Sequence, residues 1–249
     1  FKDAGYNTAH IGKWHLGHLP QYLPTQHGFD SYYGIPYSND MDKIAPKHLK
    51  GREVFRNPDW RHFNVPLLRG TRDGGVEQIE RPVDQRTITR RYVDEAIEFL
   101  RRQEADQPFF LYLAHSLPHV PLFRSDDFVG HSRAGMYGDV IEEIDAGVGR
   151  ILDELRMRQI DKRTLVVFTS DNGPWLVFDD HGGSAGPLRN GKGTTFEGGM
   201  RVPGLFWMPG VIPTSQSVAT GRSGTALSMD GYNFCSFSDD LRDLTLDDR

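Results

Sequence analysis

The stretch Pro108-Phe109-Phe110-Leu111-Tyr112-Leu113-Ala114 is a continuous apolar run that ends at a polar turn. Such a run is typical of a strand that is buried on both faces of a sheet. Helical periodicity flanks the run on both sides, over residues 82–102 and 134–158. The apolar positions at helical spacing are Ile88, Tyr92, Ala96, Ile97 and Leu100 in the first segment, and Tyr137, Val140, Ile141, Ile144, Val148, Ile151, Leu152 and Leu155 in the second.

Further apolar runs extend this alternation of strands and helices along the chain. Residues 8–14, 164–169 and 202–208 each fit a short buried strand. We therefore predict an α/β fold with a largely parallel central sheet and helices on both faces. Residues 19–76 are rich in Pro, Gly, Asn and aromatic residues and have little periodicity, which predicts mostly ordered loop. Because the first residues resemble a helix end entering a strand, we expect an internal fragment, truncated at both ends.

The composition limits the classes of function. The chain has 249 residues and a formal net charge of -5, without a basic stripe, which argues against nucleic acid as a partner. Its longest apolar stretch is too short to span a bilayer, and no signal peptide is visible in these residues. Cys235 is the single cysteine, so no intrachain disulfide and no cysteine-based zinc site is expected, and its apolar neighbours favour an inert thiol.

Polar clusters occur at or just beyond the ends of the predicted strands, where open α/β sheets bind their ligands. They are Lys13 with His15, the segment His115 to His119, Asp171 with Asn172, and the segment Arg189 to Thr195. If the first strand continues to His15, its alternation places the Lys13 and His15 side chains on one side. We expect a shared pocket for Lys13, His15, His119, Asp171 and Lys192.

The residue types in these clusters suit an anionic ester and a metal ion. Lys13 and Lys192 would supply cations for a tetrahedral oxyanion, and His15 and His119 would transfer protons. Asp171 and Asn172 offer hard oxygen ligands for Ca²⁺ or Mg²⁺. Together they predict a metal-assisted hydrolase of sulfate or phosphate esters, although no nucleophile is evident.

Each cluster alone also has an ordinary structural explanation. Asp-Asn-Gly is a common turn, and a histidine between prolines can be a packed turn residue. The stretch Gly191-Lys192-Gly193-Thr194 is similar to part of a phosphate-binding loop, but it lacks the first glycine of that motif, and no strand leads directly into it. We therefore reject nucleotide binding.

Five motifs in a fixed order resemble the type I sulfatases of the alkaline-phosphatase superfamily over residues 1–213. They are Gly12-Lys13-Trp14-His15-Leu16-Gly17, Gly34-Ile35-Pro36-Tyr37-Ser38, Pro118-His119-Val120-Pro121, Thr169-Ser170-Asp171-Asn172-Gly173 and the stretch from Gly191 to Gly199. The second motif is closest to the arylsulfatase A group.

The resemblance implies a calcium-dependent sulfuric ester hydrolase with a formylglycine nucleophile. That residue is made within Cys/Ser-x-Pro-x-Arg, which in the family lies upstream of the Gly-Lys-Trp-His-Leu-Gly motif and is absent from this chain. By position, Lys13 would bind the sulfate and His15 would serve the formylglycine hydroxyl. His119 and Lys192 would contact the sulfate near the leaving oxygen, with His119 as a candidate general acid. Calcium would be held by Asp171, which also faces the nucleophile, and by Asn172.

The resemblance also implies a domain division and a substrate class. We expect an incomplete catalytic domain over residues 1–214 and a tail of uncertain structure over 215–249, without the family's C-terminal subdomain. The chain alone should be inactive. The substrate would be a sulfated small molecule or glycan, and the location periplasmic, secreted or lysosomal. Two alternatives stay open, namely a phosphodiesterase or phosphonate hydrolase of the same superfamily and a catalytically inactive anion-binding fragment.

Overall fold

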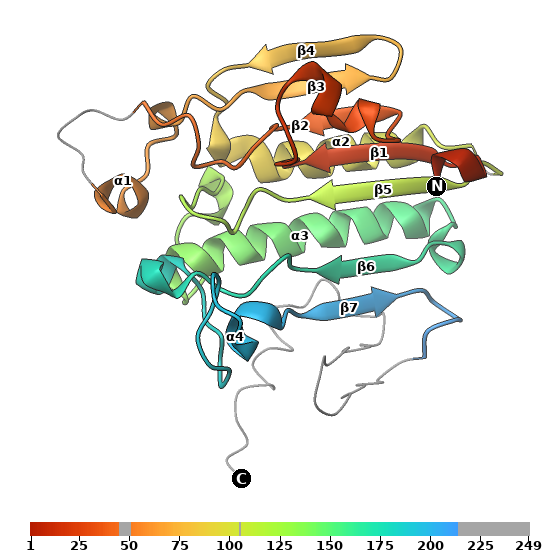
Figure 1. Ribbon diagram of the computed structural model, residues 1–249. Helices are drawn as coiled ribbons and strands as arrows, with labels where there is room; N and C mark the ends of the chain where they lie inside the picture. Colours follow the sequence, from red (N-terminus) through yellow and green to blue (C-terminus); the bar gives the residue numbers. More distant parts are fainter. Residues whose placement is uncertain (45–50, 105, 214–249) are drawn as a thin grey trace. The chain divides into compact units, whose positions relative to one another are not determined.

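The structure, a computed structural model, describes residues 1–44, 51–104 and 106–213 (Figure 1). The chain forms two compact units, Phe1–Gly147 and Val148–Arg249, and the boundary falls within helix α3, Gly135–Met157. Each unit is described by itself below. Cys235 and the expected tail over residues 215–249 lie outside the described residues.

The first unit is built on a mixed five-stranded sheet with the order β4-β3-β2-β1-β5. Strand β1 lies between β2 and β5 and pairs with both in parallel, whereas β2 with β3 and β3 with β4 pair antiparallel. The strands are β1 (Asn7–Gly12), β2 (Ser31–Gly34), β3 (Leu67–Thr71), β4 (Gly75–Glu80) and β5 (Phe109–Ala114). The α/β class with a central sheet is confirmed, and its parallel part is the group β2-β1-β5.

Strands β2 and β3 lie within residues 19–76, for which the sequence predicted mostly loop. That prediction is wrong for these two segments. Strand β2 has only four residues, Ser-Tyr-Tyr-Gly, and β3 contains a glycine, so neither has a clear alternating pattern. Both become strands because they pair with neighbours, β2 on the parallel core and β3 on β2.

The long helix α2 (Ile88–Arg101) covers one face of this sheet and contacts β1, β2 and β5. It begins after the 3-10 turn η5 (Gln85–Thr87), which the Asp84 carboxylate caps by accepting from Arg86 N, so the predicted helix over 82–102 starts later than expected. The N-terminal part of α3 packs on α2, where a Cβ on Gly147 would lie 2.6 Å from Val93 Cγ2.

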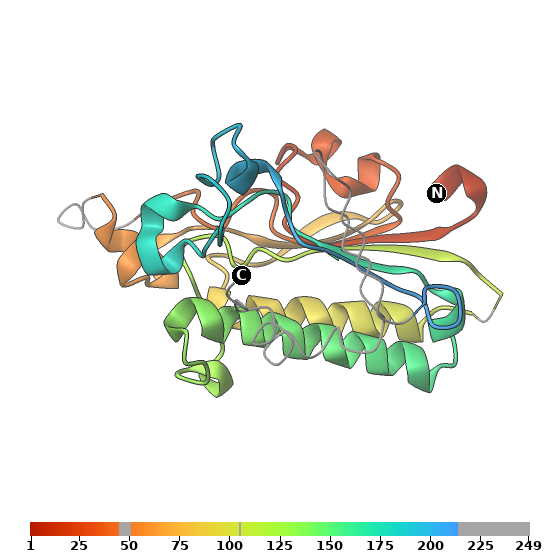
Figure 2. The same cartoon turned by 90° about the horizontal axis from the view of Figure 1, so that it is seen from below.

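The opposite face of the sheet has no long helix among the described residues of the first unit. It carries the short 3-10 turns η1 (Lys2–Ala4), η2 (Pro20–Tyr22) and η3 (Pro24–Gln26) (Figure 2). Helices were expected on both faces of the sheet, but the described residues place only short 3-10 turns on this face of the first unit. The other short elements of this unit are α1 (Glu53–Arg56), η4 (Trp60–His62) and η6 (Asp126–Phe128).

The second unit contains the end of α3 and a two-stranded antiparallel sheet of β6 (Val166–Thr169) and β7 (Gly204–Trp207). The strands predicted over 164–169 and 202–208 and the helix predicted over 134–158 are present. The expected burial is wrong for two strands, because residues of β6 are alternately half-buried and exposed and β5, in the first unit, is half-buried with Tyr112 exposed. The remaining elements are η7 (Asp161–Arg163), η8 (Leu176–His181) and α4 (Glu197–Met200). None of the helices that the structure describes has the length and apolarity that crossing a membrane requires.

Two glycines allow the carboxyl ends of the parallel strands β1, β2 and β5 to approach one another closely. Gly12 ends β1 with φ +114°, and a Cβ there would lie 1.8 Å from the carbonyl oxygen of Ala114 at the end of β5. A Cβ on Gly34, at the end of β2, would lie 1.8 Å from the Gly12 carbonyl oxygen. The loops that leave these strands therefore start side by side.

We predict that Gly12→Ala destabilises the protein by about 3 kcal/mol or more, because it adds both a backbone clash and strain at positive φ. Gly5→Ala is the matched control, since Gly5 has φ +83° but open space around its Cβ position. Its cost should be about 1 kcal/mol, from strain alone. Urea unfolding of both variants measures the difference, and equal costs would show that the close approach at Gly12 carries no energy.

Candidate active site

The segment after β1 is held between the ends of the two neighbouring strands. Lys13 N donates to Ala114 O at 2.8 Å, on the β5 side. On the β2 side, Trp14 N donates to Ile35 O at 3.0 Å and His15 N to Pro36 O at 3.1 Å. Lys13 and His15 are therefore fixed at the carboxyl edge of the parallel strands.

The conformation of this segment differs from the strand that the sequence suggested. Strand β1 ends at Gly12, and His15 has φ +61°, in the left-handed region. The condition for strand alternation is therefore not met, and alternation does not place the Lys13 and His15 side chains on one side. A non-glycine residue at positive φ costs on the order of 1 kcal/mol, and such residues are enriched at functional sites. The Trp14 indole supports the turn, since its Nε1 donates to Tyr22 O at 2.7 Å.

The segment after β5 presents His119 at the same edge. His119 Nδ1 lies 2.7 Å from the carbonyl oxygen of Val120. A carbonyl can only accept, so Nδ1 carries the proton and Nε2 is the nitrogen that gains or loses one. The backbone of this segment is tied to the loop after β2, because Asn39 Nδ2 donates to His119 O at 3.3 Å and to Pro121 O at 3.1 Å.

His115 differs from His119, although the sequence places both in one cluster. Burial lowers the pKa of His115 to about 4, and its two ring nitrogens are buried without a hydrogen-bond partner among the described residues. Burial likewise lowers the pKa of His10, on β1, to about 3. The His10 ring packs against the rings of Trp14, Phe29, Tyr32 and Tyr112. Both histidines are therefore neutral packing residues near pH 7.

The second unit brings together the other two clusters that the sequence singled out. Asp171 and Asn172 follow β6 directly after Ser170. The next residues bind the glycine-rich loop, because Gly173 N donates to Gly199 O at 3.1 Å and Lys192 N donates to Pro174 O at 2.8 Å. The short Asp-Asn-Gly turn and the Lys192 loop are therefore neighbours.

The side chains of these two segments are accessible. Asp171 is exposed and Asn172 is half-buried. Lys192 is also half-buried, and its Nζ lies 4.9 Å from the centre of the Trp175 ring, a cation–π contact. The sequence-predicted residues thus form two groups, Lys13, His15 and His119 in the first unit and Asp171, Asn172 and Lys192 in the second. A shared pocket for both groups stays a prediction.

The donor chemistry of Asp171 and Asn172 suits calcium, since both offer hard oxygen ligands. Within residues 1–44, 51–104 and 106–213, however, no group of three or more His, Cys, Asp or Glu side chains is arranged to hold a metal ion. The described residues alone therefore do not make a complete calcium site.

Sequence reasoning missed two buried polar residues behind His119. Asn39 is 0% exposed and Gln85 is 1% exposed, and Gln85 Nε2 donates to Asn39 O at 2.9 Å. Neither belongs to a motif that the sequence singled out, and a single buried amide in a loop has no periodic signal.

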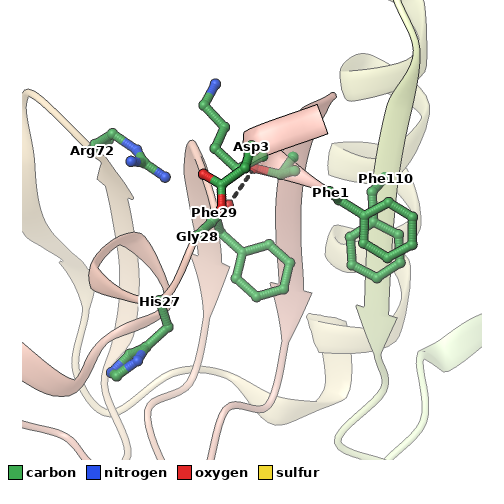
Figure 3. Close-up of a pocket in the computed structure, with 9 residues that line it drawn as sticks. Phe1, Asp3, His27, Gly28, Phe29, Arg72 and Phe110 are labelled. Atoms are coloured by element: carbon green, nitrogen blue, oxygen red, sulfur yellow. Dashed lines mark hydrogen bonds between the residues drawn. The ribbon is translucent and has the colours of Figure 1, made fainter. Parts of the chain in front are cut away.

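A cavity of about 260 Å³ lies near the opposite end of β1 from Lys13 (Figure 3). Its wall includes Thr8, the second residue of β1, and the stacked rings of Phe1 and Phe110. None of the predicted site residues lines it. The remaining lining residues are Lys2, Asp3, His27, Gly28, Phe29 and Arg72.

Comparison with known proteins gives consistent results. The model of the family described as Sulfatase matches residues 1–230. N-acetylgalactosamine-6-sulfatase of Canis lupus familiaris is 42% identical over 221 residues, which are 86% of this chain and 40% of that protein. Arylsulfatase A of Bos taurus is 39% identical over 216 residues, 84% of this chain and 41% of that protein. The chain thus spans about two fifths of the length of the curated relatives it matches.

Solved structures show the same similarity in three dimensions. The PsFucS1 sulfatase from Pseudoalteromonas sp. superposes with a TM-score of 0.70 at 31% identity, over 84% of this chain and 43% of that one. Ps i-CgsB in complex with k-i-k-neocarrahexaose superposes with a TM-score of 0.64 at 32% identity, over 85% of this chain and 46% of that one.

Proposed function

The chain belongs to the sulfatase family, and we propose that the protein of which it is part hydrolyses a sulfate monoester. The observation that carries this proposal is the edge shared by β1, β2 and β5. There the segments of Lys13, His15 and His119 are joined by backbone and side-chain hydrogen bonds. A lysine and two histidines on segments that meet at one edge suit binding and proton transfer at a tetrahedral anionic ester.

The proposed roles follow from the chemistry of each side chain. The Lys13 ammonium binds sulfate oxygens, and His15 transfers a proton at the nucleophile. His119 donates a proton from Nε2 to the leaving oxygen. Nε2 is assigned this role because Nδ1 is bound to Val120 O. The Lys192 ammonium stabilises charge that develops near the leaving oxygen.

We further propose that Asp171 and Asn172 contribute two ligands to a calcium ion, and that the other ligands come from outside the described residues. The nucleophile in this proposal is a formylglycine, also outside these 249 residues. When bound, calcium would favour the ionised form of the hydrated formylglycine. Residues 1–214 are then an incomplete catalytic domain.

The proposed substrate class is a sulfated glycan. It is supported by the names of a relative, N-acetylgalactosamine-6-sulfatase, and of a structure solved with a neocarrahexaose. An exported or lysosomal protein would meet such substrates, so we also propose a periplasmic, secreted or lysosomal location.

The test uses the full-length protein that contains this chain. We predict turnover of 4-nitrophenyl sulfate and release of sulfate from a 6-sulfated amino sugar. Both activities should be lost on chelation of calcium and restored when calcium is returned, because the proposed site needs the metal. Phosphate mono- and diesters of the same alcohols are the comparison. A higher kcat/KM for the phosphate diester would instead assign the protein to phosphodiester hydrolysis.

A further inference from the structure

A buried pair of side-chain amides lies directly behind the segment that presents His119. Asn39, in the loop after β2, is 0% exposed, and its Nδ2 donates to two carbonyl oxygens, those of His119 at 3.3 Å and Pro121 at 3.1 Å. These oxygens lie on either side of Val120, so the contacts hold both ends of a short stretch of backbone.

Gln85 connects this contact to the helical layer. It lies in η5, which leads into α2, and its Nε2 donates to the Asn39 carbonyl oxygen at 2.9 Å. The Asp84 carboxylate caps η5 and fixes its backbone, and Gln85 is the first residue of that turn. The chain of contacts therefore runs from η5 through Asn39 to the backbone of residues 119–121.

The direction of both amide groups is set by chemistry. The atoms that face them are carbonyl oxygens, which only accept, so the NH₂ groups must point toward them. Consequently Asn39 Oδ1 and Gln85 Oε1 are buried without a hydrogen-bond partner among the described residues. A buried unsatisfied acceptor costs about 1–3 kcal/mol. Apolar side chains would avoid that cost but could not bind the carbonyls of residues 119 and 121.

The consequence for His119 is geometric. Its ring is oriented by the contact of Nδ1 with Val120 O, and the Val120 peptide lies between the two carbonyls that Asn39 holds. If this backbone moves, the ring and its Nε2 move with it. A displacement of about 1 Å in a proton-transfer group can reduce a rate by about 10²-fold.

We propose that Asn39, supported by Gln85, is a positioning residue that holds the His119 imidazole at the leaving oxygen of the ester. The inference rests on the proposed function, in which His119 is the general acid. In that step the nucleophile's oxygen forms a bond to sulfur, and the bond from sulfur to the leaving oxygen breaks. Its electron pair stays on the leaving oxygen, which takes the proton from His119 Nε2, and His119 becomes neutral.

The test measures kcat/KM of the full-length protein for sulfate esters of alcohols with different acidity. A nitrophenolate leaves without protonation, whereas a sugar alcohol needs a proton as it leaves. We expect Asn39→Ala and the shape-matched Asn39→Asp to reduce kcat/KM for the sugar sulfate by about 10²-fold, with little change for 4-nitrophenyl sulfate. Gln85→Leu should show the same selectivity between the two esters with a smaller loss of kcat/KM. Gln85 contacts Asn39 and reaches the His119 segment only through it.

Gln103→Leu is the matched control. Gln103 is also a buried glutamine, 8% exposed, whose Nε2 donates to a backbone carbonyl, that of Phe99 at 2.6 Å. It lies beyond the C-terminal end of α2, far from η5 at the other end. If Gln103→Leu changes kcat/KM at all, it should reduce the value equally for the two esters. Thermal unfolding of every variant shows whether the fold is retained, and Gln85→Leu keeps the test valid if the Asn39 variants do not fold.

The outcomes separate the inference from the proposed function. An equal loss for both esters in the Asn39 and Gln85 variants would overturn the inference and leave a purely structural role. A loss of kcat/KM in the Gln103 variant that is confined to the sugar sulfate would overturn the inference as well. The same holds if His119→Ala reduces kcat/KM equally for both esters. Failure of the wild-type protein to hydrolyse either sulfate ester, with turnover of phosphate esters, would refute the proposed function itself.

Discussion

The 249 residues expressed alone will show no turnover of an aryl sulfate, whereas the full-length protein will. The reason is the missing covalent step, because cations and proton-transfer groups do not replace a nucleophile. No Cys/Ser-x-Pro-x-Arg motif occurs in the sequence, and the stretch most similar to it, Ser116 to Val120, ends in valine where the motif has arginine. Ser116 itself is buried, and its Oγ is 3.1 Å from the Tyr92 hydroxyl, so it has a structural role.

The measurement is the release of 4-nitrophenol from its sulfate by both proteins, with calcium present. Circular dichroism of the isolated chain is the control that it is folded. If the isolated chain turned over the substrate and His119→Ala abolished this activity, the nucleophile would lie within these residues and its proposed location would be incorrect.

In the full-length protein, Lys192→Ala will reduce kcat/KM by on the order of 10²-fold or more. A cation that faces developing charge in a site with little water typically contributes a few kcal/mol to transition-state stabilisation. The substitution should leave the loop in place, because the loop is anchored by Lys192 N on Pro174 O, which the alanine retains. Lys162→Ala is the matched control, since Lys162 is an exposed lysine of the same unit in η7, before β6 begins.

Asp171→Ala distinguishes loss of charge at the substrate from loss of the metal. It removes a carboxylate from the proposed calcium site, and amide or water oxygens replace a carboxylate poorly. Excess calcium should therefore partly restore the activity of Asp171→Ala and leave Lys192→Ala unchanged. Calcium titrations of both variants, with kcat/KM as the readout, make the comparison. Equal rescue of the two would show that Lys192 acts through the geometry of the metal site.

The sequence alone determined the elements with long or strongly apolar patterns. Helix α2 and helix α3 have many apolar residues at helical spacing, and β5 is a continuous apolar run, so each was predictable from local composition. The motifs around Lys13, His119, Asp171 and Lys192 likewise identified the family, because they are short stretches whose order along the chain is read directly.

The tertiary structure decided how these segments are fixed. Strand β2 exists because β1 pairs with it, and the turn at His15 exists because its amide binds Pro36 O, which lies beyond β2. The distinction between His115 and His119 is one of burial and of hydrogen-bond partners, which neighbours in the sequence do not show.

The contact from Gln85 through Asn39 to the His119 segment is the clearest example of this second kind. Asn39 is 80 positions from His119, and Gln85 is 46 positions from Asn39. A buried side-chain amide is favoured where the fold places backbone carbonyl groups within hydrogen-bond distance of it. Those carbonyls belong to distant segments, so no periodicity or motif near Asn39 or Gln85 predicts the contact. Local pattern therefore determined the long helices, the most apolar strand and the motifs that identify the family, while packing of distant segments determined short strands such as β2 and how those motifs are held.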